Sequence, residues 1–169
     1  NSDCMSISVL FAAFAAALLP AAASALAYTG TTLTGPIAGP VTVGSGYSTV
    51  IIDGATITGD LNINNIDAGA TLIIKDTVVT GGAGIIFTQA VSNLAVIMTN
   101  VVADGTAFAL DTNLGFAGGS ITVTGGSFTA PHAIRFTLVS GGAVISVSGI
   151  TAISSVGNGL SAANFADSS

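Results

Sequence analysis

Short segments with the pattern apolar, variable, apolar recur along most of this chain at a nearly constant interval. In the first series the third residues lie 22, 24, 25 and 24 positions apart, and these are Ile52, Ile74, Met98, Val123 and Val147. A second series, spaced by 24, 23 and 26 positions, consists of Ile63, Phe87, Leu110 and Phe136. Two series that stay in step while their intervals vary slightly are typical of stacked coils whose turns differ in length.

Each repeat favours strands over helices. Apolar residues alternate with period two, β-branched residues dominate, and glycine recurs every few positions. A coil of roughly 22 to 25 residues with three short strands is one turn of a parallel β-helix. Residues 50–169 are therefore predicted to form an all-β, right-handed parallel β-helix of about five coils, with both series pointing inward as ladders.

Turn-forming residues follow the first series and mark a corner of the coil. Asp53 and Asp76 are assigned to equivalent positions of successive coils, in a column that continues as Asn100 and then glycine. Because Asp and Asn tolerate tight-turn geometry, we interpret this column as structural rather than as a catalytic pair. Residues 28–49 fit the repeat poorly, and we expect an N-terminal cap or an atypical first coil there.

The repeat is preceded by an apolar segment that is expected to form a helix. Residues 7–27 carry no charge, and Ala25 and Ala27 supply the small residues that signal peptidase requires. We interpret residues 1–27 as a signal peptide cleaved before Tyr28, or as an uncleaved signal anchor. The last residues carry no capping signal, so the chain is interpreted as a piece of a longer secreted or cell-surface protein, held to the membrane by the anchor or by spans further downstream.

The charged residues exclude several functions. Eight carboxylates stand against Lys75 and Arg135, for a net charge of −6, so no basic patch is available for nucleic acid. The single cysteine, Cys4, precedes the predicted cleavage site, and His132 is the only histidine. Neither a disulfide nor a metal site is expected, and no cofactor is predicted.

A catalytic site is not recognisable in the sequence. Polysaccharide-cleaving enzymes of this fold use carboxylates that hold calcium with an Arg as base, or a cluster of Asp residues as general acid and base. Neither cluster is visible, so we expect a non-catalytic module with an adhesin-like or structural role. The alternatives are the N-terminal part of a secreted polysaccharide lyase or hydrolase whose active site lies downstream, and an ice-binding solenoid, suggested by ranks of Thr and Ser.

A strip of side chains on the predicted outer surface is the main candidate for binding. One outward column contains an exposed isoleucine ladder, which indicates cover by another segment or by a partner. His132 is expected at a turn, and Arg135 is expected to face solvent on the second sheet. The predicted contact strip for an extracellular carbohydrate or protein ligand consists of Ile51, Ile73, Ile97, Thr122, Thr124 and Arg135.

With the repeat defined, the chain resembles the pectin-lyase-like β-helix superfamily. More narrowly, the segments Gly39–Tyr47 and Gly59–Ile63 look like those of large kinetoplastid surface proteins of the dispersed gene family type and related membrane-associated proteins. The resemblance implies a β-helical ectodomain of a very long surface protein with a role in adhesion. Those proteins are richer in cysteine than this chain, and no catalytic residue of either family maps onto it.

Overall fold

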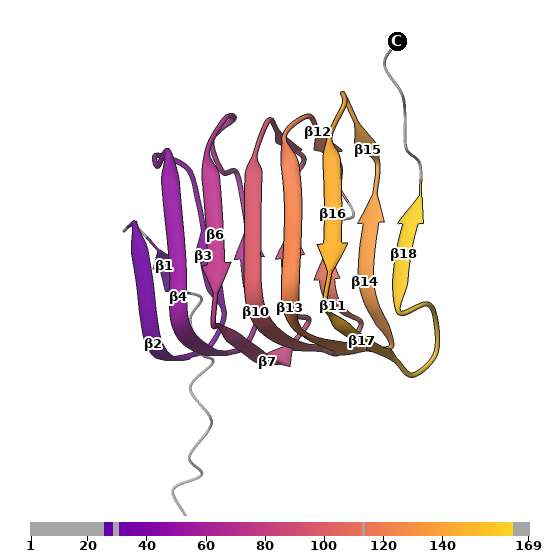
Figure 1. The fold of residues 1–169 in the computed structure, drawn as a ribbon. Helices are drawn as coiled ribbons and strands as arrows, with labels where there is room; N and C mark the ends of the chain where they lie inside the picture. The colour runs from indigo at the N-terminus through magenta and orange to yellow at the C-terminus, as the bar shows by residue number, and fades with distance from the viewer. Residues whose placement is uncertain (1–25, 29–30, 113, 164–169) are drawn as a thin grey trace, which may run out of the picture.

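The computed structural model describes residues 26–28, 31–112 and 114–163, and these form a parallel β-solenoid of about five turns. Successive coils stack along one axis, and the ribbon runs from indigo to yellow along it (Figure 1). All strand pairs within its three sheets are parallel. The all-β class and the parallel solenoid predicted from the repeat are thereby confirmed. The predicted signal helix lies almost wholly outside the described residues.

One strand of each coil enters a seven-stranded sheet. Its strands are, in order, β1 (Leu26–Tyr28), β3 (Val41–Val43), β5 (Leu61–Ile63), β8 (Ile85–Phe87), β11 (Phe108–Asp111), β14 (His132–Thr137) and β18 (Leu160–Ala163).

An eight-stranded sheet contains most of the remaining strands, and its longer strands bend around a corner. It contains β2 (Thr32–Ala38), β4 (Thr49–Thr58), β6 (Thr71–Lys75), β7 (Val78–Gly82), β10 (Ala95–Gly105), β13 (Ser120–Ala130), β16 (Val144–Ser148) and β17 (Thr151–Ser154). A small third sheet contains β9 (Val91–Ser92), β12 (Phe116–Ala117) and β15 (Val139–Ser140).

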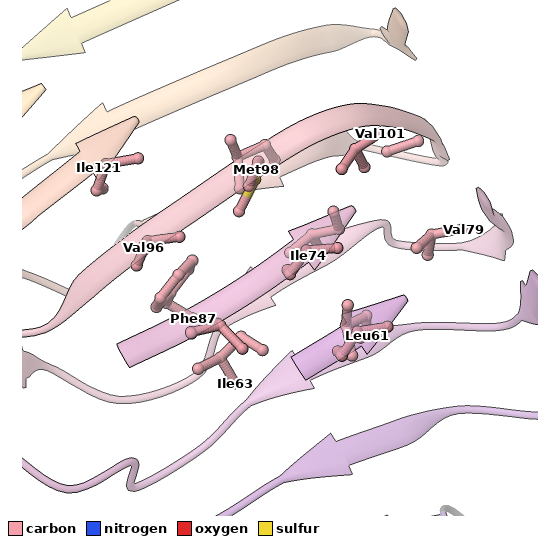
Figure 2. Close-up of a cluster of buried hydrophobic side chains, with 14 of the residues drawn as sticks. Leu61, Ile63, Ile74, Val79, Phe87, Val96, Met98, Val101 and Ile121 are labelled. Carbon is pink, nitrogen blue, oxygen red and sulfur yellow. The ribbon is translucent and has the colours of Figure 1, made fainter. Parts of the chain in front are cut away.

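The first predicted ladder forms the interior row of the eight-stranded sheet. Ile52, Ile74, Met98 and Val123 are paired in register along the stack and are fully buried. Figure 2 shows such side chains from both sheets gathered in one interior, with Leu61, Ile63 and Phe87 on one side. Burying one side chain of this size stabilises the fold by about 1.5 to 3 kcal/mol, so a continuous interior carries most of the stability.

The second predicted ladder is wrong at one position. Leu110 pairs with Ile85 and Ile134, not with Phe87 and Phe136 as the spacing predicted. The reason is that Ala109 and Leu110 are both buried, so the strict alternation of inward and outward residues is broken in β11. Thr112 takes the interior position level with Phe136, and its backbone N–H donates to the carbonyl oxygen of Arg135 at 3.0 Å.

The predicted turn column is present, but with a different first member. Asp53 pairs with Lys75, so Gly54 rather than Asp53 lies level with Asp76. Every residue of the corner column has a positive φ, between 46° and 67°; the members are Gly54, Asp76, Asn100, Gly125 and Gly149. This left-handed conformation is open to glycine and tolerated by Asn and Asp, which explains the residue types. The Asn100 amide also donates to the Asp76 carboxylate of the preceding coil at 3.1 Å.

Asn100→Ala is expected to lower the free energy of unfolding by about 1 to 2 kcal/mol. The alanine backbone is strained in the left-handed conformation, and the hydrogen bond to Asp76 is lost. Asn100→Gly, which matches other members of the column, is expected to cost less than about 1 kcal/mol. Urea denaturation of both variants measures the difference. Equal losses would show that the backbone conformation at this corner is not the cause.

Burial falls in the coil that contains β16, β17 and β18. Its inward residues Ile145, Val147 and Ala152 are half-buried, whereas their counterparts in the preceding coil are almost completely buried. Leu160 is 50% exposed, and Val144 and Ile153 are also exposed. The inward residues of this coil are more exposed because the described residues place a coil on only one side of it.

Candidate functional site

The predicted contact strip lies on two different faces of the solenoid. Ile51, Ile73, Ile97 and Thr122 form one outward row of the eight-stranded sheet, paired in register as expected. Thr124 lies in the next outward row, level with Thr99 and Lys75. Ile97 is 39% exposed, and no described segment crosses this face (Figure 1). Arg135 is separate from these residues because it lies on β14 of the seven-stranded sheet.

Lys75 and Asp53 form an ion pair in that second outward row. Lys75 Nζ lies 2.9 Å from Asp53 Oδ2, with 45% and 39% of the two side chains exposed. The hydrogen bond to Asp53, together with its charge, raises the pKa of Lys75. A raised pKa adds stability that is fully present below the ordinary value of 10.5 and is lost as pH rises through the higher value in the folded state.

Lys75→Met is expected to leave the melting temperature unchanged within about 2 °C at neutral pH and physiological salt, because water and salt screen an exposed pair. Any remaining difference should shrink as the pH rises above 10.5, the ordinary pKa of lysine, and through the higher pKa of Lys75 in the folded state. Differential scanning calorimetry of the variant and the wild-type chain checks both statements. A large loss at neutral pH would mean that this pair is part of the stabilising framework.

Arg135 forms a much more enclosed ion pair with Asp111, which sequence reasoning did not single out. The two residues are direct partners on the neighbouring strands β11 and β14. Arg135 Nε donates to Asp111 Oδ1 at 2.8 Å and Nη2 donates to Oδ2 at 2.6 Å, so the contact is bidentate. The Asp111 side chain is only 8% exposed and that of Arg135 is 27% exposed. The expectation that Arg135 simply faces solvent is therefore corrected, since the buried carboxylate draws the guanidinium onto the sheet.

Two ring systems lie beside this pair. Phe108 and His132 are partners on β11 and β14, and their rings stack with centroids 5.4 Å apart and planes 24° apart. Arg135 Cζ lies 3.7 Å from the centre of the Phe108 ring, within the range of a cation–π contact. His132 was predicted at a turn; it begins strand β14 and is exposed. Phe108, His132 and Arg135 thus form one connected group.

The next coil completes the group with two polar side chains. Ser161 on β18 is the strand partner of Arg135, and Asn158 lies in the loop just before β18. Together these residues line a shallow hollow of about 270 Å³ with Phe108 and His132. We call the whole group the Arg135 patch, and its members are Phe108, Asp111, His132, Arg135, Asn158 and Ser161.

The missed members of the Arg135 patch do have a signal in the sequence. Phe108, His132 and Asn158 are 24 and 26 positions apart, and Asp111, Arg135 and Ser161 have the same two intervals. Each interval is about the length of one repeat, so polar and aromatic residues recur at equivalent positions of an otherwise apolar repeat. This recurrence can be recognised only when the register of β11 is known, and the spacing in the sequence predicted the wrong register at Leu110.

Within the described residues, one hydrogen-bonded side-chain pair lies in the Arg135 patch. The Asp111 carboxylate is held by Arg135, and the described part of the chain gives His132 no side-chain hydrogen bond to Ser161. No group of three potential metal ligands is found among the described residues either. The Arg135 patch therefore combines two stacked rings with hydrogen-bonding side chains around a small hollow.

A second hollow, of about 330 Å³, lies at the corner before β11 and β14. Asp104 is the only charged residue in its lining, and Gly82 and Gly105 form part of its wall. A side chain at Gly82 would collide with the backbone of the adjacent coil, and one at Gly105 would collide with the Phe108 carbonyl group of its own coil. This hollow is explained by packing.

Across the parts of the chain that the structure describes, no helix is long and apolar enough to cross a membrane. Comparisons with protein-family models, with curated proteins and with solved structures find no match for this chain.

Proposed function

We propose that this chain is a non-catalytic, adhesin-like module of an exported protein, secreted or held at the cell surface, whose right-handed β-helix binds an extracellular ligand. The uncharged segment at residues 7–27 supports export. The scarcity of charge and the repeat are typical of surface solenoids, in agreement with the resemblance to pectin-lyase-like and kinetoplastid surface proteins. The Arg135 patch is the surface that we propose as the binding site.

The observation that carries the proposal is the enclosed pair of Asp111 and Arg135 on an outer face. Removing two charges from water costs several kcal/mol per ion, and hydrophobic residues of similar size often stabilise a fold equally well. The equivalent outward positions on the preceding strands are occupied by Asn62 and Ile86 without any such pair. Because the solenoid does not need these charges for stacking, a role in ligand recognition is the better explanation.

The test is binding of the purified full chain to an array of extracellular polysaccharides and matrix proteins. Asn158→Ala/Ser161→Ala removes two rim side chains of the Arg135 patch, and Thr56→Ala, at an exposed site on the eight-stranded sheet, is the matched control. We expect at least one probe that wild type and control bind equally and that the double variant binds about tenfold more weakly, a difference of about 1.4 kcal/mol.

Three results would overturn the proposal. The first is no bound probe, and the second is binding that the double variant retains in full. The third is release of soluble fragments from a polysaccharide probe, which would indicate an enzyme. A parallel Thr122→Ala/Thr124→Ala variant tests the predicted strip, and a loss in that variant alone would move the binding site to the eight-stranded sheet.

A further inference from the structure

The polar groups of the Arg135 patch are arranged as an open rim. Asp111 occupies Nε and Nη2 of the Arg135 guanidinium, and no hydrogen bond within the described residues occupies Nη1. The same holds for the side chains of His132, Asn158 and Ser161, all of which line the hollow. The rim therefore presents both donors and acceptors to a bound molecule.

The charge around the Arg135 patch disfavours an anionic ligand. The guanidinium is neutralised by the Asp111 carboxylate, so the pair has no net charge. Lys75, the other basic residue of the chain, lies on the eight-stranded sheet and is paired with Asp53. The chain as a whole carries −6, and the exposed carboxylate of Asp104 lies in the same coil as Phe108. A carboxylated or sulfated ligand would meet a negative field without an unpaired cation to hold it.

The shape of the Arg135 patch favours an extended ligand with polar edges. Asp111, Arg135 and Ser161 form a row along the solenoid axis, and the rings of Phe108 and His132 stack beside it. The row spans two strand spacings, about 10 Å. The backbone groups of β11 and β14 are paired on both sides, so an added peptide strand cannot bind there. Over these two strands, recognition therefore uses ring edges and side-chain hydrogen bonds.

From these observations we infer that the Arg135 patch binds a neutral oligosaccharide lying along the solenoid axis over β11, β14 and β18, an inference that rests on the proposed binding function. The C–H groups of the sugar would lie against the parts of Phe108 and His132 that line the hollow, because the face of the Phe108 ring is occupied by His132 and by the Arg135 guanidinium. The sugar hydroxyl groups would pair with Arg135 Nη1, Asn158 and Ser161. The hollow is small and open, so affinity is expected to be weak, with Kd around 1 mM.

The chain provides its own probes for the test. Arg135 is the only arginine and His132 the only histidine, so the Arg Nε–Hε signal and the imidazole signals in NMR spectra are assigned without further work. Neutral series of cello-, malto-, xylo- and manno-oligosaccharides are titrated against oligogalacturonate and heparin fragments. We expect saturable shifts of both reporters with at least one neutral series, and about tenfold weaker binding in Asn158→Ala/Ser161→Ala but not in Thr56→Ala.

The outcomes separate this inference from the function on which it rests. Saturable shifts with acidic saccharides alone, or with a matrix protein alone, would overturn the neutral ligand but keep the Arg135 patch as a binding site. NMR shifts that do not saturate, or that are the same in the double variant, would also overturn the inference that the Arg135 patch binds a neutral oligosaccharide. The absence of a response to every probe of both panels would overturn both proposals.

Discussion

Gly126→Ala is expected to lower the free energy of unfolding by more than about 3 kcal/mol, because backbone strain and a steric clash coincide at this glycine. Gly126 has φ +90°, and a Cβ there would overlap the carbonyl oxygen of Val101 and lie 2.7 Å from its nitrogen. These atoms belong to the backbone of the adjacent coil, so no side chain can move aside. The two coils would have to separate, which breaks the ladder between β10 and β13.

Gly54→Ala is the matched control for this experiment. Gly54 also has a positive φ, of +62°, but a Cβ there meets nothing within 4 Å. Its expected cost is only the strain of the left-handed conformation, about 1 to 2 kcal/mol. Chemical denaturation of both variants compares the loss of stability from a clash between coils with the loss from backbone strain alone. Similar losses at the two positions would contradict the view that close coil contact restricts Gly126.

Arg135→Met is expected to destabilise the fold by about 2 to 4 kcal/mol, because it leaves the buried Asp111 carboxylate without a partner. The estimate is below the maximum for buried pairs since 27% of the Arg135 side chain is exposed. The double variant Asp111→Leu/Arg135→Met removes both charges and should regain most of the loss. Denaturant unfolding of the single and double variants gives both values.

This pair of variants also tests the argument for function. If the double variant is as stable as wild type yet binds no ligand, the ion pair serves recognition rather than stability. If the double variant is as unstable as Arg135→Met, the loss arises from packing of the guanidinium over Phe108 instead of from an unpaired charge. A single variant within about 0.5 kcal/mol of wild type would show that water reaches Asp111 and that the pair is not enclosed.

The eight-stranded sheet could be predicted from sequence because its signals agree. Around Ile52, Ile74 and Met98 the apolar alternation is unbroken, the residues are mostly β-branched, and a turn-forming residue follows at a fixed distance. Each of these signals assigns the same register, and a slip by one residue would turn the apolar side chains outward. Both the inward ladder and the outward isoleucine row therefore followed from the pattern.

The Arg135 patch could not be predicted because its strand is irregular. Phe108, Ala109 and Leu110 fit the repeat as an apolar, variable, apolar triplet, which would point Phe108 inward. In the structure alanine is small enough for Ala109 and Leu110 both to be buried, and Phe108 turns to the outer surface beside His132. The same shift aligns Asp111 with Arg135. A pattern of apolar and polar positions alone does not reveal two consecutive buried residues, so it assigned β11 the wrong register.

The position of the Arg135 patch across three coils gives it a second property. Its residues lie on β11, on β14, and on β18 with the loop before it, so one bound molecule would contact three successive coils. A molecule that holds Asn158 and Ser161 against Arg135 would stabilise the stacking of these coils by mass action. Occupancy of the surface and order in the coils beneath it are thus thermodynamically linked, and amide exchange would report ligand binding far more widely than its few contacts.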